Sequence, residues 1–416
     1  MAQVAFPPVA PEYEDGDVGL LEELEEADDD KPHSRGCADW FLNLHVVQRW
    51  LIVFAVVGGL AGLLVGLLLR FDAGPGDGGR TYTRPIVVNT WFSVANAEAY
   101  QLLQRGYSAL DAVELGCTAC EDAQCDGTVG WGSSEDSTGA VSLDAIIMDA
   151  ETHDVGAVTY LTAVRHAIAA ARKVMHYSTH TLLAGAGADD FAIMMGLPRQ
   201  ELRSNASTAD YEDWVARSCQ QNNWVNVVGG NTSCPPYAPI PTPTYTPVPA
   251  AVAAVGAGAP AAPARPPRPA VTQYNHDTVS MCAIDAAGRL AGGGSSNGLR
   301  HKIAGRSSDI GLTGAGLYAD REGGCAAATG DGDITQRFLP AFVAVEFMRV
   351  GLSPGDACER AVRRIMAYHA SFQIGLVCLD RYGNVGAASF GWTFTYAVAA
   401  GPNATTTIVS VPPLTP

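Results

Sequence analysis

Residues 235–270, "PPYAPIPTPTYTPVPAAVAAVGAGAPAAPARPPRPA", constrain the fold of this chain more than any other segment. They are nearly all Pro, Ala, Thr and Gly, so they bury little apolar surface, and their prolines cannot donate to a sheet ladder. We interpret them as a disordered or polyproline-like linker, with a Pro-rich recognition ligand as the alternative. A folded core must therefore be assembled from the two flanking segments, residues 85–234 and 278–416.

Residues 50–69, "WLIVFAVVGGLAGLLVGLLL", predict a single membrane-spanning helix. The segment carries no charge, lies between Arg49 and Arg70, and is long enough to cross a bilayer. An acidic tail, residues 1–49, precedes it and is expected to be disordered and cytosolic, and a Gly-rich tether, residues 70–84, follows it. The span lies too far from Met1 for an ordinary signal peptide, but a signal anchor that is later trimmed stays open.

Charge, cysteines and glycosylation sequons indicate the compartment. A formal net charge of -17 without clustered Lys and Arg excludes a nucleic-acid-binding surface. Basic residues flank the span evenly, so they do not decide its orientation. Closely spaced cysteines are typical of oxidising compartments, and no second CxxC or HExxH motif supports a zinc site. The sequons, all after the span, favour a catalytic part in the secretory lumen; they are Asn205, Asn231 and Asn403.

Hydrophobic periodicity predicts alternating strands and helices. Strand-like runs cover residues 85–91 and 141–150, and helical patterns cover 94–117 and 163–175. After the linker, two hairpins are expected, turning at residues 286–288 and 382–384, with amphipathic helices over 333–351 and 353–370 between them. Strand pairs with flanking helices favour a layered α/β sandwich.

Thr278 occupies a position that suits a nucleophile. It begins a strand directly after the linker and Asp277, in "NHDTVSMCAID". A Thr hydroxyl needs a neighbouring base, and an α-amino group released on the same residue is such a base. Cleavage between Asp277 and Thr278 would create it through attack of the Thr278 hydroxyl on the Asp277 carbonyl, an acyl shift from nitrogen to oxygen, and hydrolysis. Taken alone, Thr278 also fits an ordinary strand residue.

Many motifs around Thr278 resemble the glycosylasparaginase branch of the N-terminal-nucleophile hydrolases. They include "RPIVVNTWF", "SALDAVELGCTACE", "QCDGTVGWGSSED", "HDTV", "SSNG", "IAGRSSDIG", "GAGLYAD" and "AAATGDGDI", and the similarity covers residues 85–231 and 274–394. The resemblance implies a four-layer αββα sandwich. It also implies that residues 85–234 and 278–416 become the α and β chains of an enzyme that cleaves itself.

The resemblance implies a role for each matching residue. Thr278 would be the nucleophile, and Thr329 and Gly330 would form the oxyanion hole and contact the substrate. Arg306 would bind the α-carboxylate of the substrate and Asp309 its α-ammonium. The remaining implied residues are Trp91, which would line the pocket, and His276, Asp277 and Ser296, which with Thr278 would support self-cleavage.

Some positions depart from the family pattern. Ser296 stands where the family usually has a second Thr, which keeps the hydroxyl but puts the cleavage rate in doubt, and Ile310 replaces a small polar residue, so the pocket near Asp309 is expected to differ. The resemblance implies three disulfides, Cys120–Cys125, Cys219–Cys234 and Cys358–Cys378. It leaves four cysteines unpaired, namely Cys37, Cys117, Cys282 and Cys325.

The implied reaction is hydrolysis of the amide between N-acetylglucosamine and an asparagine side chain, through a β-aspartyl ester on Thr278. No metal or cofactor is expected. The family also implies a dimer of αβ units and a late step of glycoprotein breakdown in a lysosome-like or vacuolar compartment. Two alternatives stay open: an isoaspartyl peptidase or L-asparaginase of the same superfamily, against which His276 and the "NTW" at Trp91 speak, and a membrane-anchored binding protein that cannot cleave itself.

Overall fold

A computed structural model describes residues 80–229, 232–240 and 278–415. The expected tail, membrane span and tether, most of the linker, and His276, Asp277, Asn231 and Cys37 lie outside these residues. Among the helices that are described, none combines the length and apolar character that a membrane crossing requires.

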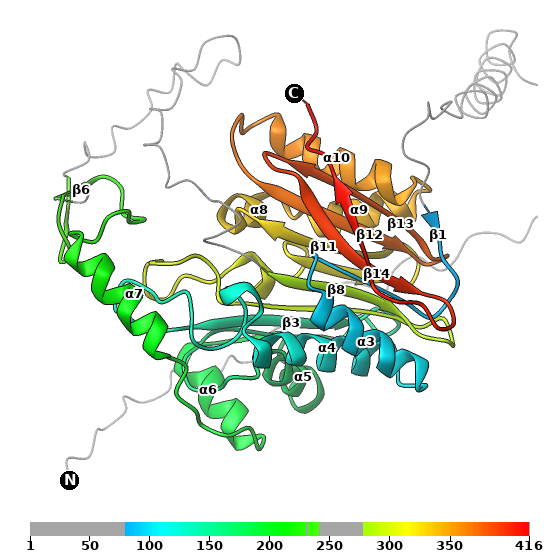
Figure 1. Ribbon diagram of the computed structural model, residues 1–416, viewed down its shortest axis with the longest axis horizontal. Helices are drawn as coiled ribbons and strands as arrows, with labels where there is room; N and C mark the ends of the chain where they lie inside the picture. Colours follow the sequence, from blue (N-terminus) through cyan, green and yellow to red (C-terminus); the bar gives the residue numbers. More distant parts are fainter. Residues whose placement is uncertain (1–79, 230–231, 241–277, 416) are drawn as a thin grey trace, which may run out of the picture. The chain divides into compact units, whose positions relative to one another are not determined.

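The larger of two central sheets has eight strands and joins segments from both sides of the linker (Figure 1). All its neighbouring strands are antiparallel except the parallel pair β4–β5. In spatial order the strands are β15 (Thr407–Val411), β14 (Phe394–Ala400), β2 (Ile86–Asn89), β8 (Val279–Ile284), β9 (Leu290–Ser296), β3 (Leu143–Asp149), β4 (Val155–Leu161) and β5 (Leu182–Ala184).

The second sheet has five antiparallel strands, nearly all from the part after the linker. In spatial order they are β1 (Arg80–Thr81), β13 (Asn384–Phe390), β12 (Ile374–Asp380), β11 (Gly324–Gly330) and β10 (Leu317–Asp320). A separate short pair, β6 (Val227–Val228) with β7 (Ala238–Pro239), lies near the start of the linker.

Helices cover the outer faces of both sheets, which makes four layers (Figure 1). The larger sheet is covered by α3 (Ser93–Gln104), α4 (Ala109–Ala123) and α5 (Ala167–Tyr177), with α6 (Gly185–Met194) and α7 (Asn205–Ala216) beyond them. The smaller sheet is covered by α9 (Pro340–Arg349) and α10 (Pro354–Met366). Three apolar cores fill the spaces between successive layers. The expected αββα sandwich is confirmed.

The single helix expected over residues 333–351 is wrong. The structure has two helices there, α8 (Gly332–Phe338) and α9, separated at Leu339, whose φ is 51°. Proline disfavours the α conformation in the residue before it and is well suited to the first turn of a helix. Pro340 therefore ends α8 and starts α9.

Candidate active site

Thr278 directly precedes β8 and is 5% exposed. The end of β2 holds it in place. The Thr90 hydroxyl donates to the Thr278 carbonyl oxygen and accepts from the Ser280 amide at 3.0 Å, while the Thr90 amide donates to the Ser280 carbonyl at 3.0 Å. Thr90 was not singled out in the sequence, where a Thr after a strand carries no signal. These bonds attach the candidate nucleophile to the part of the chain before the linker.

Ser296 ends β9, directly beside Thr278. Val279 pairs with Ser295, so the same antiparallel register places Thr278 opposite Ser296 and on the same face of the sheet. Ser296 is fully buried, and its hydroxyl accepts from the Gly298 amide at 2.8 Å. The structure therefore brings together two hydroxyls that the sequence separates by 18 positions.

Thr278 and Thr329 both point into the space between the two sheets. In β8, alternate residues from Cys282 onward lie in the central core between the sheets, so Thr278 points the same way. In β11, Cys325 and Ala327 lie in that core as well, which directs Thr329 toward β8.

The carbonyl of Gly316 bridges the two strands. It accepts from the Ser280 hydroxyl at 3.0 Å and from the Ala328 amide at 2.8 Å. The Gly316 amide in turn donates to the Asp309 carbonyl at 3.1 Å. One backbone unit thus fixes the strand of Thr278, the strand of Thr329 and the loop of Asp309 relative to one another.

Gly330 ends β11 in a conformation that requires glycine. Its φ is +134°, and a β-carbon there would lie 2.3 Å from the carbonyl oxygen of Gln373. Asp331, the next residue, donates its amide to that same carbonyl at 2.8 Å. The chain therefore turns sharply at the place where the sequence predicts an oxyanion hole.

Arg306 and Asp309 converge on Gly332, the first residue of α8. A β-carbon on Gly332 would lie 2.4 Å from Asp309 Oδ1 and 3.0 Å from Arg306 Nη2. Arg306 Nε also lies 3.3 Å from Asp333 Oδ1. Within the described residues, Arg306 Nη1 and Asp309 Oδ2 are buried without a hydrogen-bond partner. A cation and a carboxylate with free hydrogen-bonding capacity can bind a carboxylate and an ammonium group.

Burial, helped by the neighbouring charges of Asp333 and Asp331 and opposed by Arg306, raises the pKa of Asp309 to about 7. Asp309 begins a short 3₁₀ turn, Asp309–Gly311. Asp144 of β3 holds this turn, since its Oδ2 accepts from the Ser308 amide at 2.8 Å. Asp144 was missed in the sequence, although an acid inside the apolar run "LDAIIMD" was a usable signal.

Trp91 follows Thr90 and is half-buried, with a φ of 57° and its ring 5.1 Å from that of Phe92. Its position next to Thr90 brings its backbone close to Thr278, but its contact with a substrate stays a prediction. Two of the sequons are on exposed asparagines, Asn205 at the start of α7 and Asn403 after β14.

Four disulfides are present in the described residues. Three are the pairs expected, Cys120–Cys125, Cys219–Cys234 and Cys358–Cys378. The fourth corrects the sequence analysis, which left its members unpaired: it joins Cys282 of β8 to Cys325 of β11. These residues are 43 positions apart and meet only because the two sheets face each other. Cys117 is a buried thiol, and burial raises its pKa.

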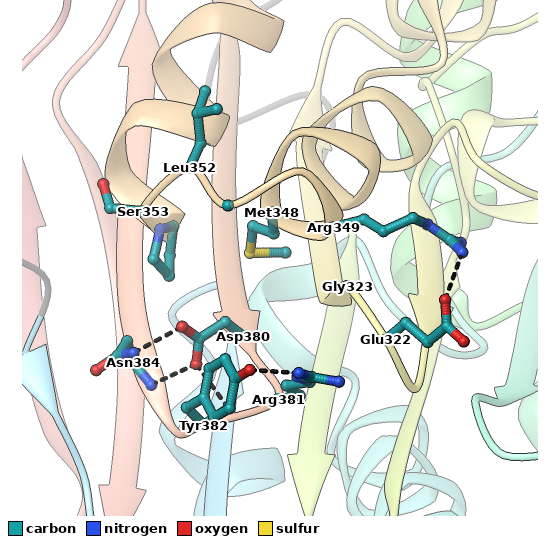
Figure 2. Close-up of a pocket in the computed structure, with 12 residues that line it drawn as sticks. Glu322, Gly323, Met348, Arg349, Leu352, Ser353, Asp380, Arg381, Tyr382 and Asn384 are labelled. Carbon is teal, nitrogen blue, oxygen red and sulfur yellow. Dashed lines mark hydrogen bonds and ion pairs between the residues drawn. The ribbon is translucent and has the colours of Figure 1, made fainter. Parts of the chain in front are cut away.

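A cavity of about 410 Å³ lies away from these residues. It is at the opposite end of β11, where Gly323 precedes the strand, and Figure 2 shows Arg349 reaching Glu322 and Asn384 beside Asp380. Arg349 pairs with Glu322, Asp380 accepts from Asn384 and Arg381 donates to Tyr382, so these groups already have partners and we look for the chemistry in the Thr278 region. The described residues contain no cluster of His, Cys, Asp and Glu that could hold a metal ion.

Comparisons with known proteins show the family of the chain. A family model described as asparaginase matches residues 75–409. The rat protein named N(4)-(Beta-N-acetylglucosaminyl)-L-asparaginase is 44% identical over 306 residues, which is 73% of this chain and 84% of the rat protein. The mouse protein of that name is 43% identical over the same shares. The Arabidopsis thaliana protein named Probable isoaspartyl peptidase/L-asparaginase 3 is 44% identical over 76% of this chain and 87% of its own length.

Proposed function

This chain belongs to the asparaginase family, and from that premise we propose that it is a self-cleaving amidohydrolase that releases N-acetylglucosaminylamine from asparagine. The observation that carries the proposal is that Thr278 and Thr329 lie on strands that the Gly316 carbonyl joins between the two sheets, and that Arg306 and Asp309 converge on Gly332, three residues after Thr329. This arrangement supplies a nucleophile, an oxyanion site and groups of both charges for an amino acid.

In the proposed activation step, the Thr278 hydroxyl attacks the Asp277 carbonyl carbon. The peptide C–N bond breaks, an ester forms on Thr278, and water then releases Asp277 as a carboxylate. In this proposal Ser296, opposite Thr278 in the register of the two strands, hydrogen-bonds the hydroxyl and assists the attack. The product is a β chain that begins with Thr278 and carries a free α-amine.

In the proposed catalytic cycle, that amine accepts the Thr278 hydroxyl proton while the oxygen attacks the substrate amide carbon. The Thr329 hydroxyl and the Gly330 amide stabilise the oxyanion that forms. The proton then passes to the departing glycosylamine, and water hydrolyses the β-aspartyl ester. Arg306 and Asp309 hold the α-carboxylate and α-ammonium, so the substrate must be free of flanking peptide.

The first test is the intact mass of the full chain, with Thr278→Ala and Thr278→Ser as a matched pair. We expect the wild type and Thr278→Ser to yield a β chain starting at residue 278, whereas Thr278→Ala stays whole because it lacks the hydroxyl. A wild-type chain that stays whole when folded would contradict the proposal and would favour the binding-protein alternative.

A second candidate is an isoaspartyl peptidase, which the name of the Arabidopsis relative favours. Both reactions use a β-aspartyl ester, so the distinction lies in the leaving group. We expect N-acetylglucosaminyl-asparagine to be hydrolysed with at least a tenfold higher kcat/KM than a β-aspartyl dipeptide. The reverse ratio would assign the chain to the second activity.

We also propose the setting in which the enzyme works. Residues 50–69 would form a single membrane span, with residues 1–49 in the cytosol and the catalytic part in the lumen of an acidic, lysosome-like compartment. Two αβ units would assemble into a heterotetramer after cleavage. The exposed sequon residues Asn205 and Asn403 support a lumenal location, and loss of mass after glycosidase treatment of the purified protein tests it.

A further inference from the structure

The Cys282–Cys325 disulfide links the two sheets. Cys282 belongs to the eight-stranded sheet and Cys325 to the five-stranded sheet, and both are fully buried. Their Cα atoms are 5.8 Å apart, whereas facing sheets are usually about 10 Å apart. The other three disulfides in the described residues do not cross between the sheets.

Glycine makes this approach possible. Gly292 of β9 pairs with Cys282, and a β-carbon on Gly292 would lie 2.9 Å from Cys325 Sγ. A side chain there would push the sulfur atoms away from their present position. The disulfide therefore occupies a space that the neighbouring strand leaves open for it.

The disulfide is aligned with the candidate site. Cys282 lies four residues after Thr278 in β8, and Cys325 lies four residues before Thr329 in β11, all on the inner faces of the sheets. Between these two levels, the Gly316 carbonyl accepts hydrogen bonds from both strands at 3.0 and 2.8 Å. The strands that carry Thr278 and Thr329 are thus joined by hydrogen bonds near the site and, farther along both strands, by a covalent bond.

We propose that Cys282 and Cys325 are positioning residues, whose bond fixes the distance between Thr278 and the Thr329–Gly330 turn. The inference rests on the proposed function. Attack on a carbonyl and stabilisation of its oxyanion both depend on placement to a fraction of an ångström. Arg306 and Asp309 are placed by contacts that do not involve the disulfide, because the Asp309 carbonyl accepts from Gly316, the Ser308 amide donates to Asp144, and both side chains lie against Gly332. Loss of the bond should therefore lower kcat and leave KM nearly unchanged.

The test compares two double variants of the full chain. Cys282→Val/Cys325→Ala removes the inter-sheet bond with little change in core volume, and Cys358→Ala/Cys378→Ala removes the bond between α10 and β12 as a matched control. Peptide masses under non-reducing conditions first establish that both bonds exist in the wild type. Self-cleavage, kcat and KM are then measured per cleaved molecule, well below the melting temperature of each protein.

We expect the inter-sheet variant to lose about tenfold in kcat with KM within twofold, and the control variant to keep both constants within twofold even if it melts earlier. Free thiols at Cys282 and Cys325 in the wild type, a kcat within twofold in the variant, or a matching rise in KM would each overturn the inference. If the first variant does not accumulate, Cys282→Ala/Cys325→Val redistributes the same volume. A wild type that forms the bond but neither cleaves nor hydrolyses would instead overturn the proposed function.

Discussion

Arg306 combines a contact and an unused donor that a lysine could not reproduce. Its Nε lies 3.3 Å from Asp333, while Nη1 is buried without a partner among the described residues. A guanidinium can keep the Asp333 contact and still donate to a substrate carboxylate, but an ammonium is a compact charge without that fork geometry. We expect Arg306→Lys to raise KM at least about tenfold, measured by steady-state hydrolysis of N-acetylglucosaminyl-asparagine.

Arg300→Lys provides the control for this prediction. Arg300 lies in the same loop but pairs with Asp210 of α7, at 2.6 Å. The substitution is the same and keeps the positive charge, and the neighbouring sequence is shared, so KM should stay within twofold. Equal effects of both substitutions would mean that Arg306 does not contact the substrate.

We expect ligand binding at Asp309 to release a proton. Burial raises the pKa of Asp309 to about 7, so at pH 6 the carboxyl is mostly protonated. An α-ammonium group favours the ionised form and lowers that pKa. Binding of aspartate, the expected product, should therefore release close to one proton at pH 6.

Calorimetry of aspartate binding in two buffers with different ionisation enthalpies measures this release. Asp309→Asn should bind more weakly and release no proton from this position. A binding heat that is independent of the buffer in the wild type would show that Asp309 does not change its protonation state when the ligand binds.

The packing of β8 against its neighbours depends on Gly294 of β9. A β-carbon there would lie 2.6 Å from the Val279 carbonyl oxygen and 2.6 Å from Ile310 Cδ1. Gly294→Ala must therefore displace β8 or the turn of Asp309, at a cost of about 1–3 kcal/mol. We expect a lower melting temperature, measured by calorimetry, and slower self-cleavage, measured by the appearance of the β chain on gels.

Gly187→Ala is the matched substitution, because Gly187 lies in α6 with no atom within 4 Å of an added β-carbon. It should leave cleavage unchanged and be neutral or slightly stabilising, since alanine favours helix. Equal destabilisation by both substitutions would rule out crowding at Gly294 as the cause.

At the level of elements, the sequence predicts single helices and strands well, but it predicts interruptions of a helix poorly. The hairpin β8–β9 follows from strand alternation and a short turn, and α10 follows from Ser353 and Pro354 at its start. The interruption at Leu339 was missed because the apolar periodicity continues across it. The strands β14 and β15, and helices α6 and α7, were not predicted from periodicity at all.

The relation between the two sheets could not be predicted from periodicity or spacing. Alternation shows that Cys282 and Cys325 point to one face of their strands, but not which strand of the other sheet lies opposite. The same holds for Gly316 and Gly332, whose importance comes from contacts with residues far away in the sequence. The roles of Thr278, Arg306 and Asp309 came from the family resemblance, because single residue types carry little information.

Buried ionisable groups make the stability of the whole molecule depend on pH. Burial raises the pKa of Glu121 to about 7 from 4.5, against hydrogen bonds from Ser295 and Ile168, and raises that of Asp309 to about 7 from 3.8. Folded carboxyls with raised pKa values bind protons more tightly than the same groups in the unfolded chain. Their stabilising contribution to the free energy of unfolding is therefore complete at about pH 4 and is lost as the pH rises through 7.

His301 opposes this trend. Burial, with nearby Arg300, lowers its pKa from 6.5 to about 4, so its contribution grows as the pH rises through that interval. The two carboxyls outweigh the one histidine between pH 5 and 7. We therefore expect the free energy of unfolding to fall across this range by roughly 1 kcal/mol per pH unit, measured by denaturant titration of the cleaved enzyme.

Glu121→Gln separates this effect from a general charge effect. The amide keeps the shape of the buried side chain but cannot titrate, so the fall in unfolding free energy between pH 5 and 7 should become shallower. Glu212→Gln, on the exposed face of α7, makes the same chemical change and should leave the slope unchanged. A wild-type stability that is constant or rises from pH 5 to 7 would contradict the argument. A free energy of unfolding that is higher at pH 5 than at pH 7 would suit the catalytic part to the acidic compartment proposed for it.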